Sequence, residues 1–255
     1  MMKSIFWKSI YLGKKSILWM VYLIFAFYIG HLVLTVPAFG TKVIFGSIGT
    51  IVLSIVLLFE YLKNSYEKMI YALTIECDLT IAKQRKIDLQ KKDLFNGFKQ
   101  SIIIFDSLLL LDEGKYQECL AHLERHQRFF HGTLDYLFIY YHTQMYCYYF
   151  LKDQKNLHIS LEHLTKLQST NKKQMRGLFS WHEIIGINYL YQNRNRKCLK
   201  ELELIDQNKL NNRELTYLLY VKGQCLLKLE QKSEGYRLLK EAKVSGNTLA
   251  ITQVI

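Results

Sequence analysis

The sequence predicts an all-α protein, in which an N-terminal transmembrane helical hairpin is followed by an α-solenoid of about four helix pairs. Three observations predict this fold. Two apolar runs of membrane-spanning length occupy residues 17–36 and 43–62, Pro37 is the only proline, and a helix–turn–helix pattern recurs about every 40 residues. The predicted segments are a basic cytoplasmic N-terminus (1–15), the hairpin (16–62), a juxtamembrane helix (63–96) and a helical-repeat domain (97–255).

The two apolar runs satisfy the length and composition of membrane spans. A bilayer core of ~30 Å needs roughly 20 apolar residues at 1.5 Å per residue. Neither run contains Lys or Arg, and Glu60 is the only acidic residue in them. Because only residues 37–42 separate the runs, the sequence predicts two antiparallel spans joined by a short turn.

The flanking charges predict the orientation of the hairpin. Four lysines and no acidic residue precede the first run, and seven basic residues lie between positions 63 and 92. Since Lys and Arg near span ends stay cytoplasmic, both termini are expected inside. The short anchor favours a bacterial plasma membrane. The alternative is a signal peptide cleaved near residues 36–38, but its apolar part would exceed the usual 7–15 residues.

Small residues at a spacing of four lie in both runs, where they would let helix backbones approach closely in lipid. We expect them to pack the two spans together, and self-association into a homo-oligomer is the alternative. The span-packing residues predicted in this way are Ala26, Gly30, Gly46, Thr50 and Ser54.

The composition of the chain limits the classes of partner that we expect. The chain has 34 Lys and Arg against 22 Asp and Glu, a formal charge of +12, which suits an anionic lipid surface. Nucleic acid is the less favoured alternative, because no zinc-finger spacing or RNP-like motif occurs. Five widely spaced cysteines with no C-x-x-C indicate reduced, buried thiols and not a disulfide or zinc framework.

After the hairpin, residues 66–92 are predicted to form one long helix that continues from the second span. Its apolar stripe consists of Met69, Leu73, Cys77 and Ile81, spaced four apart. We expect the basic segment 83–92 to be the solvated end of this helix, acting as a spacer or as an arm that contacts lipid.

The rest of the chain contains a repeated helix–turn–helix pattern. Four apolar helices each end in a short polar turn that a more polar helix follows, and the turns start at residues 112, 152, 192 and 230. Repeating helix pairs of this size are typical of an α-solenoid, in which each pair buries its apolar face against its neighbours.

Residues 97–245 resemble a tetratricopeptide-repeat domain. That family places small and large apolar residues at fixed positions of each helix pair. The third unit carries Gly186, Tyr189, Cys198, Leu202 and Ile205 at these spacings, and the fourth carries Gly223, Leu226, Gly235, Leu239 and Ala242. The residue near the start of the second helix is small in all four units (Cys119, Ser160, Cys198 and Gly235), as close helix crossing requires.

The resemblance implies a concave groove, lined by the first helix of each pair, that binds a peptide or a helix of a protein partner. We call its nine residues the predicted groove: His142, Met145, Tyr149, Ser180, Glu183, Ile187, Tyr217, Tyr220 and Gln224. Residues 135–151 contain eight aromatic residues, which we interpret as core material, with an aromatic ligand groove as the alternative.

No catalytic or cofactor-binding constellation is recognisable. His122 and His126 are four apart on one helix but lack the Glu that follows the first His in the zincin pattern. The sequence predicts no enzymatic activity, cofactor or metal. The expected function is a membrane-anchored adaptor or scaffold that binds a protein or peptide at the cytoplasmic membrane face. The alternative is a regulatory or immunity-type protein that acts through its hairpin, with the solenoid as its sensing or docking half.

Overall fold

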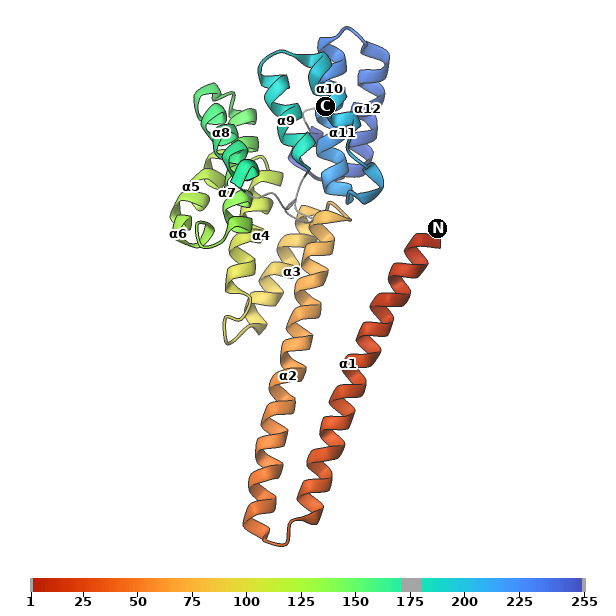
Figure 1. Ribbon diagram of the computed structural model, residues 1–255, viewed down its shortest axis with the longest axis vertical. Coiled ribbons are helices and arrows are strands. Elements are labelled where there is room, and N and C mark those ends of the chain that lie inside the picture. The colour runs from red at the N-terminus through yellow and green to blue at the C-terminus, as the bar shows by residue number, and fades with distance from the viewer. Residues whose placement is uncertain (1, 171–179, 254–255) are drawn as a thin grey trace. The chain divides into compact units, whose positions relative to one another are not determined.

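The computed structural model describes residues 2–170 and 180–253, with side chains for residues 19–168 and 180–253. These residues form thirteen α-helices and one 3-10 helix, and the described part contains no strand, so the all-α prediction is confirmed. The chain divides into two compact units, Met1–Asn64 and Ser65–Ile255 (Figure 1). We call them unit 1 and unit 2 and describe each by itself.

Unit 1 consists of α1 (Met2–Thr35) and most of α2 (Phe39–Thr74), joined at Pro37. Of the described helices, α2 alone is long and apolar enough to cross a membrane, and only 6% of its most apolar window is buried. The part of α1 for which side chains are described, Trp19–Thr35, is a shorter apolar helix. The last ten residues of α2, from Ser65 onward, belong to unit 2.

The contact between α1 and α2 follows a different line from the predicted small-residue stripe. A Cβ atom on Gly49 would lie 2.5 Å from Ile29 Cγ2, and one on Gly46 would lie 3.7 Å from Val33 Cγ2. Only Gly46 of the predicted set therefore faces the partner helix, and sequence reasoning missed Gly49. The other four residues of the predicted set are exposed: Ala26, Gly30, Thr50 and Ser54.

The predicted single helix over residues 66–92 is wrong, because α2 ends at Thr74 and α3 spans Leu79–Lys92. Cys77 takes a left-handed backbone conformation (φ 50°), which a continuous helix does not allow. Asp78 then caps α3 by accepting a hydrogen bond from the Ile81 backbone N–H at 2.9 Å. As a consequence Met69, Leu73 and Cys77 are buried, whereas Ile81 is exposed.

The basic residues of α3 make ion pairs within unit 2. Three of them pair with acidic side chains of unit 2: Lys83 with Glu113, Arg85 with Glu76 at 3.5 Å, and Lys86 with Asp106 at 2.9 Å. These ion pairs tie α3 to the rest of unit 2, while Lys83, Lys91 and Lys92 are exposed, as a solvated end predicts.

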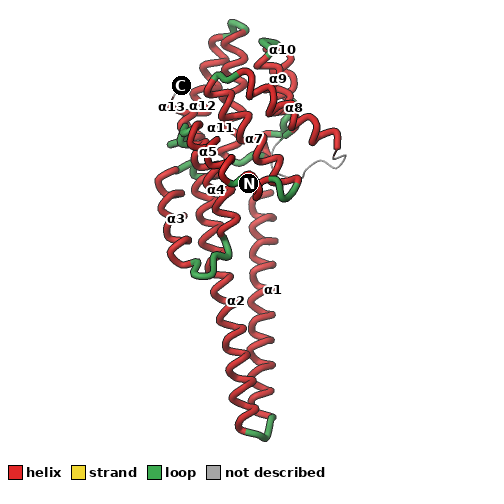
Figure 2. Tube along the Cα trace, turned by 90° about the vertical axis from the view of Figure 1, so that its left-hand side faces the viewer, coloured by secondary structure: helices red, strands yellow, loops and turns green. Residues whose placement is uncertain are grey.

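Eight longer helices follow in four consecutive pairs, and each predicted turn lies between the two helices of a pair (Figure 2). The pairs are α4 (Lys99–Asp112) with α5 (Tyr116–Arg125), α7 (Leu134–Leu151) with α8 (Gln154–Thr170), α9 (Trp181–Tyr191) with α10 (Asn195–Glu203), and α11 (Asn212–Lys228) with α12 (Lys232–Gly246). The short elements are α6 (Gln127–Phe130), the 3-10 helix η1 (Gln207–Lys209) and α13 (Ala250–Gln253).

All four turns end the first helix in the same way. One residue in each has a left-handed backbone: Gly114, Lys152, Asn193 and Glu230. The next N–H then bonds the carbonyl oxygen five residues earlier at 2.8–3.0 Å, for example Gln231 to Leu226. This 6→1 bond satisfies a carbonyl that the helix end would otherwise leave unpaired. The period in sequence is therefore also a period in local structure.

Small residues occur where the helices of a pair cross. A Cβ atom on Gly223 would lie 3.1 Å from the carbonyl oxygen of Gly235, which leaves no room for a side chain. In the first pair the Cys119 thiol donates to the carbonyl oxygen of Ser107 at 3.2 Å. All five cysteines are buried, as the sequence predicted.

The C-terminal end of unit 2 returns to its beginning. The backbone N–H of Thr248 donates to the Cys77 carbonyl oxygen at 3.2 Å, and the Thr248 hydroxyl accepts from the Leu79 N–H at 2.9 Å. The side chain of Asn212 donates to the Ile75 carbonyl oxygen at 2.7 Å. The first and last elements of unit 2 are thus joined by hydrogen bonds, which an open superhelix would not provide.

Candidate functional site

A cluster of buried polar side chains lies inside unit 2. It draws on four helices, α4, α7, α9 and α11, which are the first helices of the four pairs. We call it the polar cluster. Its buried members are Asp112, His142, Tyr146, Arg213 and Tyr217, and its partly exposed member is Glu183.

One half of the polar cluster is a buried ion pair. Arg213 Nε donates to Asp112 Oδ2 at 2.5 Å, and the Tyr217 hydroxyl donates to Asp112 Oδ1 at 2.8 Å. Asp112 is fully buried and Arg213 is 5% exposed. Burial lowers the pKa of Arg213, but the negative charge of Asp112 outweighs it and holds the guanidinium pKa above its usual value.

The other half centres on Glu183. The Tyr146 hydroxyl donates to Glu183 Oε1, and His142 Nε2 lies 3.9 Å from the same oxygen. Burial raises the pKa of Glu183 to about 7 and lowers that of His142 to about 3. The rings of Tyr146 and Tyr217 meet edge to face at 4.9 Å and link the two halves.

The polar cluster links four helices of unit 2 through side-chain contacts. The cavity among its side chains has room for about one water molecule, so it does not hold a substrate-sized ligand. Its ion pair joins residues 101 positions apart in the chain. Removing one partner would leave an uncompensated buried charge, which is strongly destabilising.

The predicted groove is largely filled by the protein itself. Met145 and Ile187 are core residues with at most 1% exposure, and His142 and Tyr217 belong to the buried polar cluster. These four residues therefore cannot touch a partner in this structure, which corrects the prediction. The members that keep some exposure are Tyr149, Ser180, Glu183, Tyr220 and Gln224.

The aromatic helix is core material, as we interpreted it from the sequence. The segment corresponds to α7, in which Phe138, Tyr140 and Tyr146 are buried. The other five aromatic residues are partly buried and pack against the main core of unit 2: Tyr136, Tyr141, Tyr148, Tyr149 and Phe150.

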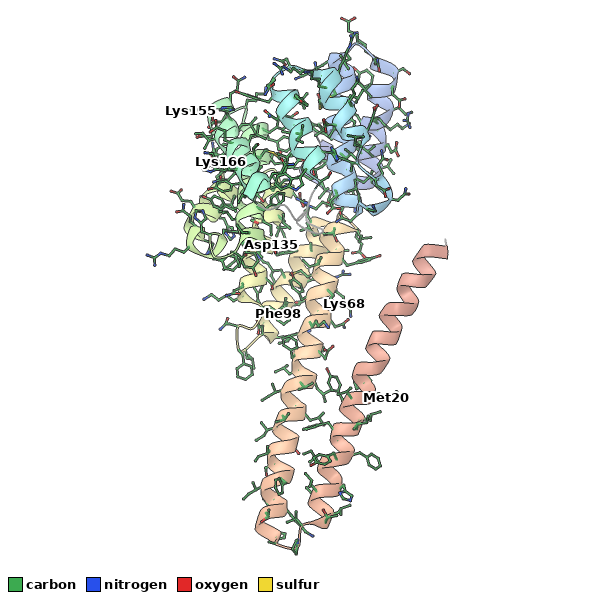
Figure 3. The ribbon with its side chains drawn as sticks, in the orientation of Figure 1. Met20, Lys68, Phe98, Asp135, Lys155 and Lys166 are labelled. Atoms are coloured by element: carbon green, nitrogen blue, oxygen red, sulfur yellow. The ribbon has the colours of Figure 1, made fainter. Side chains whose placement is uncertain are left out.

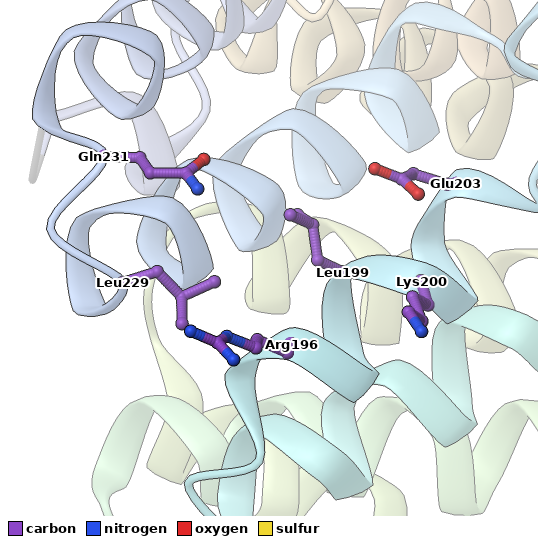
Figure 4. Close-up of a pocket in the computed structure, with 6 residues that line it drawn as sticks. All are labelled: Arg196, Leu199, Lys200, Glu203, Leu229 and Gln231. Atoms are coloured by element: carbon purple, nitrogen blue, oxygen red, sulfur yellow. The ribbon is translucent and has the colours of Figure 1, made fainter.

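An open depression lies between α10, α11 and α12, and we call it the α10–α12 groove. Its apolar lining consists of Leu199, Leu219, Leu226, Leu229 and Leu238. Figure 4 shows one end, where four α10 residues face Leu229 and Gln231 of the α11–α12 connection. The charged residues of the lining carry both signs: Arg196, Lys200, Glu203, Lys222, Glu234, Arg237 and Glu241.

The histidine pair on α5 is explained by packing. His122 Nε2 lies 2.9 Å from the carbonyl oxygen of Ile103 on α4, and the rings of His122 and His126 are 4.7 Å apart. Within the described residues, no group of three or more His, Cys, Asp or Glu side chains is arranged to hold a metal ion.

Sequence reasoning missed three members of the polar cluster, Asp112, Tyr146 and Arg213, as well as the α10–α12 groove. Asp112 looked like an ordinary turn residue, and Arg213 lies near the start of a helix where solvated charges are common. Their pairing depends on long-range packing, for which one sequence carries no local signal. No family model, curated protein or solved structure matches the chain.

Proposed function

We propose that the protein is a membrane-anchored adaptor whose cytoplasmic unit 2 binds a protein partner. The observation that carries the proposal is α2, one uninterrupted helix that begins in an exposed apolar segment and ends in a folded unit. Exposed apolar side chains on a long helix are stable in lipid and costly in water. In this proposal α1 and α2 both span the bilayer, and the chain catalyses no reaction.

The α10–α12 groove supports partner binding better than the predicted groove does. Its lining is apolar at the base. The charged residues on α10 are Arg196, Lys200 and Glu203, with a positive balance, and those on α12 are Glu234, Arg237 and Glu241, with a negative balance. An amphipathic helix of a partner, apolar on one face and bearing acidic residues toward α10, matches this arrangement. Tethering at the membrane raises the effective concentration of such a partner without new contacts.

Proximity labelling in the native host tests this assignment. The labelling enzyme is fused to the C-terminus of the full chain, and the test variant is Arg196→Glu with Lys200→Glu, two exposed residues of the groove lining. We expect a specific labelled protein to disappear with this variant. The matched control is Arg128→Glu with Lys155→Glu, which makes the same charge change at exposed sites outside the groove and should retain the labelled protein. Loss with both variants or with neither would contradict the groove.

The exposed small residues of unit 1 favour a second candidate, a regulator that acts on another membrane protein through its hairpin. Ala26 and Gly30 on α1, and Thr50 and Ser54 on α2, are exposed, and small exposed residues would allow close packing with another span. The two candidates differ in what residues 65–255 do alone. Capture of the labelled partner by this fragment supports the adaptor, and loss of capture by a folded fragment supports action through the hairpin.

A further inference from the structure

The connection between α3 and α4, residues 93–98, exposes two large apolar side chains side by side in sequence. Leu94 is 78% exposed and Phe95 is 79% exposed. Most large apolar residues of unit 2 face its core, so two adjacent ones in solvent need an explanation.

Hydrogen bonds fix the conformation of this connection, and we call its two exposed residues, Leu94 and Phe95, the tip. The buried carboxylate of Asp93 accepts hydrogen bonds from the backbone N–H groups of Gly97 at 2.9 Å and Phe98 at 2.8 Å. Asn96 takes a left-handed conformation (φ 54°), which completes the reversal of the chain. Leu94 and Phe95 lie between these anchored points, with their side chains in solvent.

The same connection packs on the part of α2 that belongs to unit 2. Phe98, which is labelled in Figure 3, packs its ring on that of Tyr66 at a centroid distance of 5.4 Å, and both residues belong to unit 2. Tyr66 follows Leu62, the last residue of the apolar run, by only four positions. Four residues reach at most about 14 Å even when fully extended, so the tip lies near the membrane surface if α2 spans.

Basic residues on both sides of the two exposed apolar residues also favour binding to a lipid surface. Lys91 before the tip and Lys99 after it are both exposed. Basic residues beside inserted apolar ones are the combination that binds anionic headgroups and the acyl boundary together. A protein partner is the other possible occupant of this surface. We favour the bilayer, because a spanning α2 would itself bring the connection close to lipid.

We propose that residues 91–99 form a second membrane contact, in which Leu94 and Phe95 insert into the interface of an anionic bilayer and Lys91 and Lys99 bind its headgroups. This inference rests on the proposed anchoring by α2. It adds a membrane contact made by unit 2 itself to the anchor made by the spans.

The test uses three single-cysteine-labelled forms of the full chain in vesicles of phosphatidylcholine and phosphatidylglycerol. An environment-sensitive fluorophore is attached at Phe95→Cys, at Val244→Cys or at Ile51→Cys, and the five native thiols are buried. Val244 on α12 is a matched control, because it is 79% exposed, as Phe95 is. Ile51 reports on α2 itself. Quenching by brominated lipid and by aqueous iodide is compared at each site.

We expect lipid quenching at position 95 to exceed that at position 244 by about threefold or more, with the opposite order for iodide. Substitution of Lys91 and Lys99 by Gln should weaken lipid quenching at 95 and leave that at 51 unchanged. Lipid quenching at 51 with equal iodide quenching at 95 and 244 would overturn the second contact and leave the anchor intact. Absence of lipid quenching at 51 would overturn the anchor and this inference together.

Discussion

Units 1 and 2 use the same kinds of apolar side chain in opposite ways. In unit 1, Phe27, Ile51 and Ile55 are more than half exposed. In unit 2, Phe105, Phe138 and Leu164 are almost completely buried. Unit 2 also buries charges, which it satisfies through the polar cluster. The difference indicates that unit 2 is stabilised by its own core, whereas the described part of unit 1 leaves much of its apolar surface exposed.

The largest expected effect comes from breaking the buried ion pair of unit 2. Arg213→Leu leaves the carboxylate of Asp112 buried without its cation, so we expect a loss of about 3–5 kcal/mol in the free energy of unfolding. Urea unfolding of residues 65–255, followed by circular dichroism, measures it. The double variant with Asp112→Leu should recover part of the loss. The control Arg237→Leu breaks an exposed ion pair with Glu234 and should change little. Equal effects of Arg213→Leu and Arg237→Leu would refute the structural role of the polar cluster.

The pH dependence of unit 2 should contain two opposing contributions. His142 has a lowered pKa of about 3, so between pH 3 and its unfolded value of about 6.5 the unfolded chain binds more protons and stability rises with pH. Glu183 has a raised pKa of about 7, so between about pH 4.3 and 7 the folded chain binds more protons and stability falls with rising pH. The two contributions nearly cancel between about pH 4.5 and 6.5.

Single substitutions should expose each contribution, with a slope of up to about 1.4 kcal/mol per pH unit. In His142→Gln the stability of residues 65–255 should fall from pH 4.5 to 7. In Glu183→Gln it should rise from pH 3 to 6.5. Unfolding free energies at a series of pH values provide the test, and identical pH profiles for the two variants would contradict the assigned pKa shifts.

In unit 1 the expected effect is smaller and confined to one glycine. A leucine at Gly49 would collide with Ile29 and force α1 and α2 apart, at a cost of about 1–3 kcal/mol. Gly30→Leu is the matched control, because nothing lies within 4 Å of an added Cβ atom there. Electron spin labels on the two helices of the full chain in lipid would measure the separation. An increase for Gly30→Leu and none for Gly49→Leu would show that the helices pack through the predicted stripe.

The smallest expected effect concerns the helix turns. Glu230 has a left-handed backbone (φ 63°) that costs a residue with a Cβ atom about 1 kcal/mol. Glu230→Gly should therefore raise the unfolding free energy of residues 65–255 by about that amount. At the neighbouring Gln231, where φ is −83°, the same change to Gly should bring no gain. A gain at both positions would point to a cause other than backbone strain.

The local features of this protein could be predicted from its sequence. Apolar runs, turn residues and small residues are short-range signals, and they predicted the apolar part of α2, the four turns and the close crossing at Gly223 and Gly235. The break at Cys77 was missed although Asp78, a residue type favoured at helix N-caps, follows it, because the apolar stripe runs on across the break. The predicted groove was partly wrong because Asp112 and Arg213 meet across it. Contacts between residues 101 positions apart leave no local pattern.

The most direct test of the account is the accessibility of two engineered cysteines in intact cells. Ala38→Cys lies in the α1–α2 connection, and Val244→Cys lies on exposed α12. A membrane-impermeant maleimide should label position 38 in intact cells and position 244 only after permeabilisation, since α1 and α2 are proposed to span the bilayer with unit 2 inside. Labelling of position 244 in intact cells, or of position 38 only after permeabilisation, would contradict the membrane-anchored adaptor.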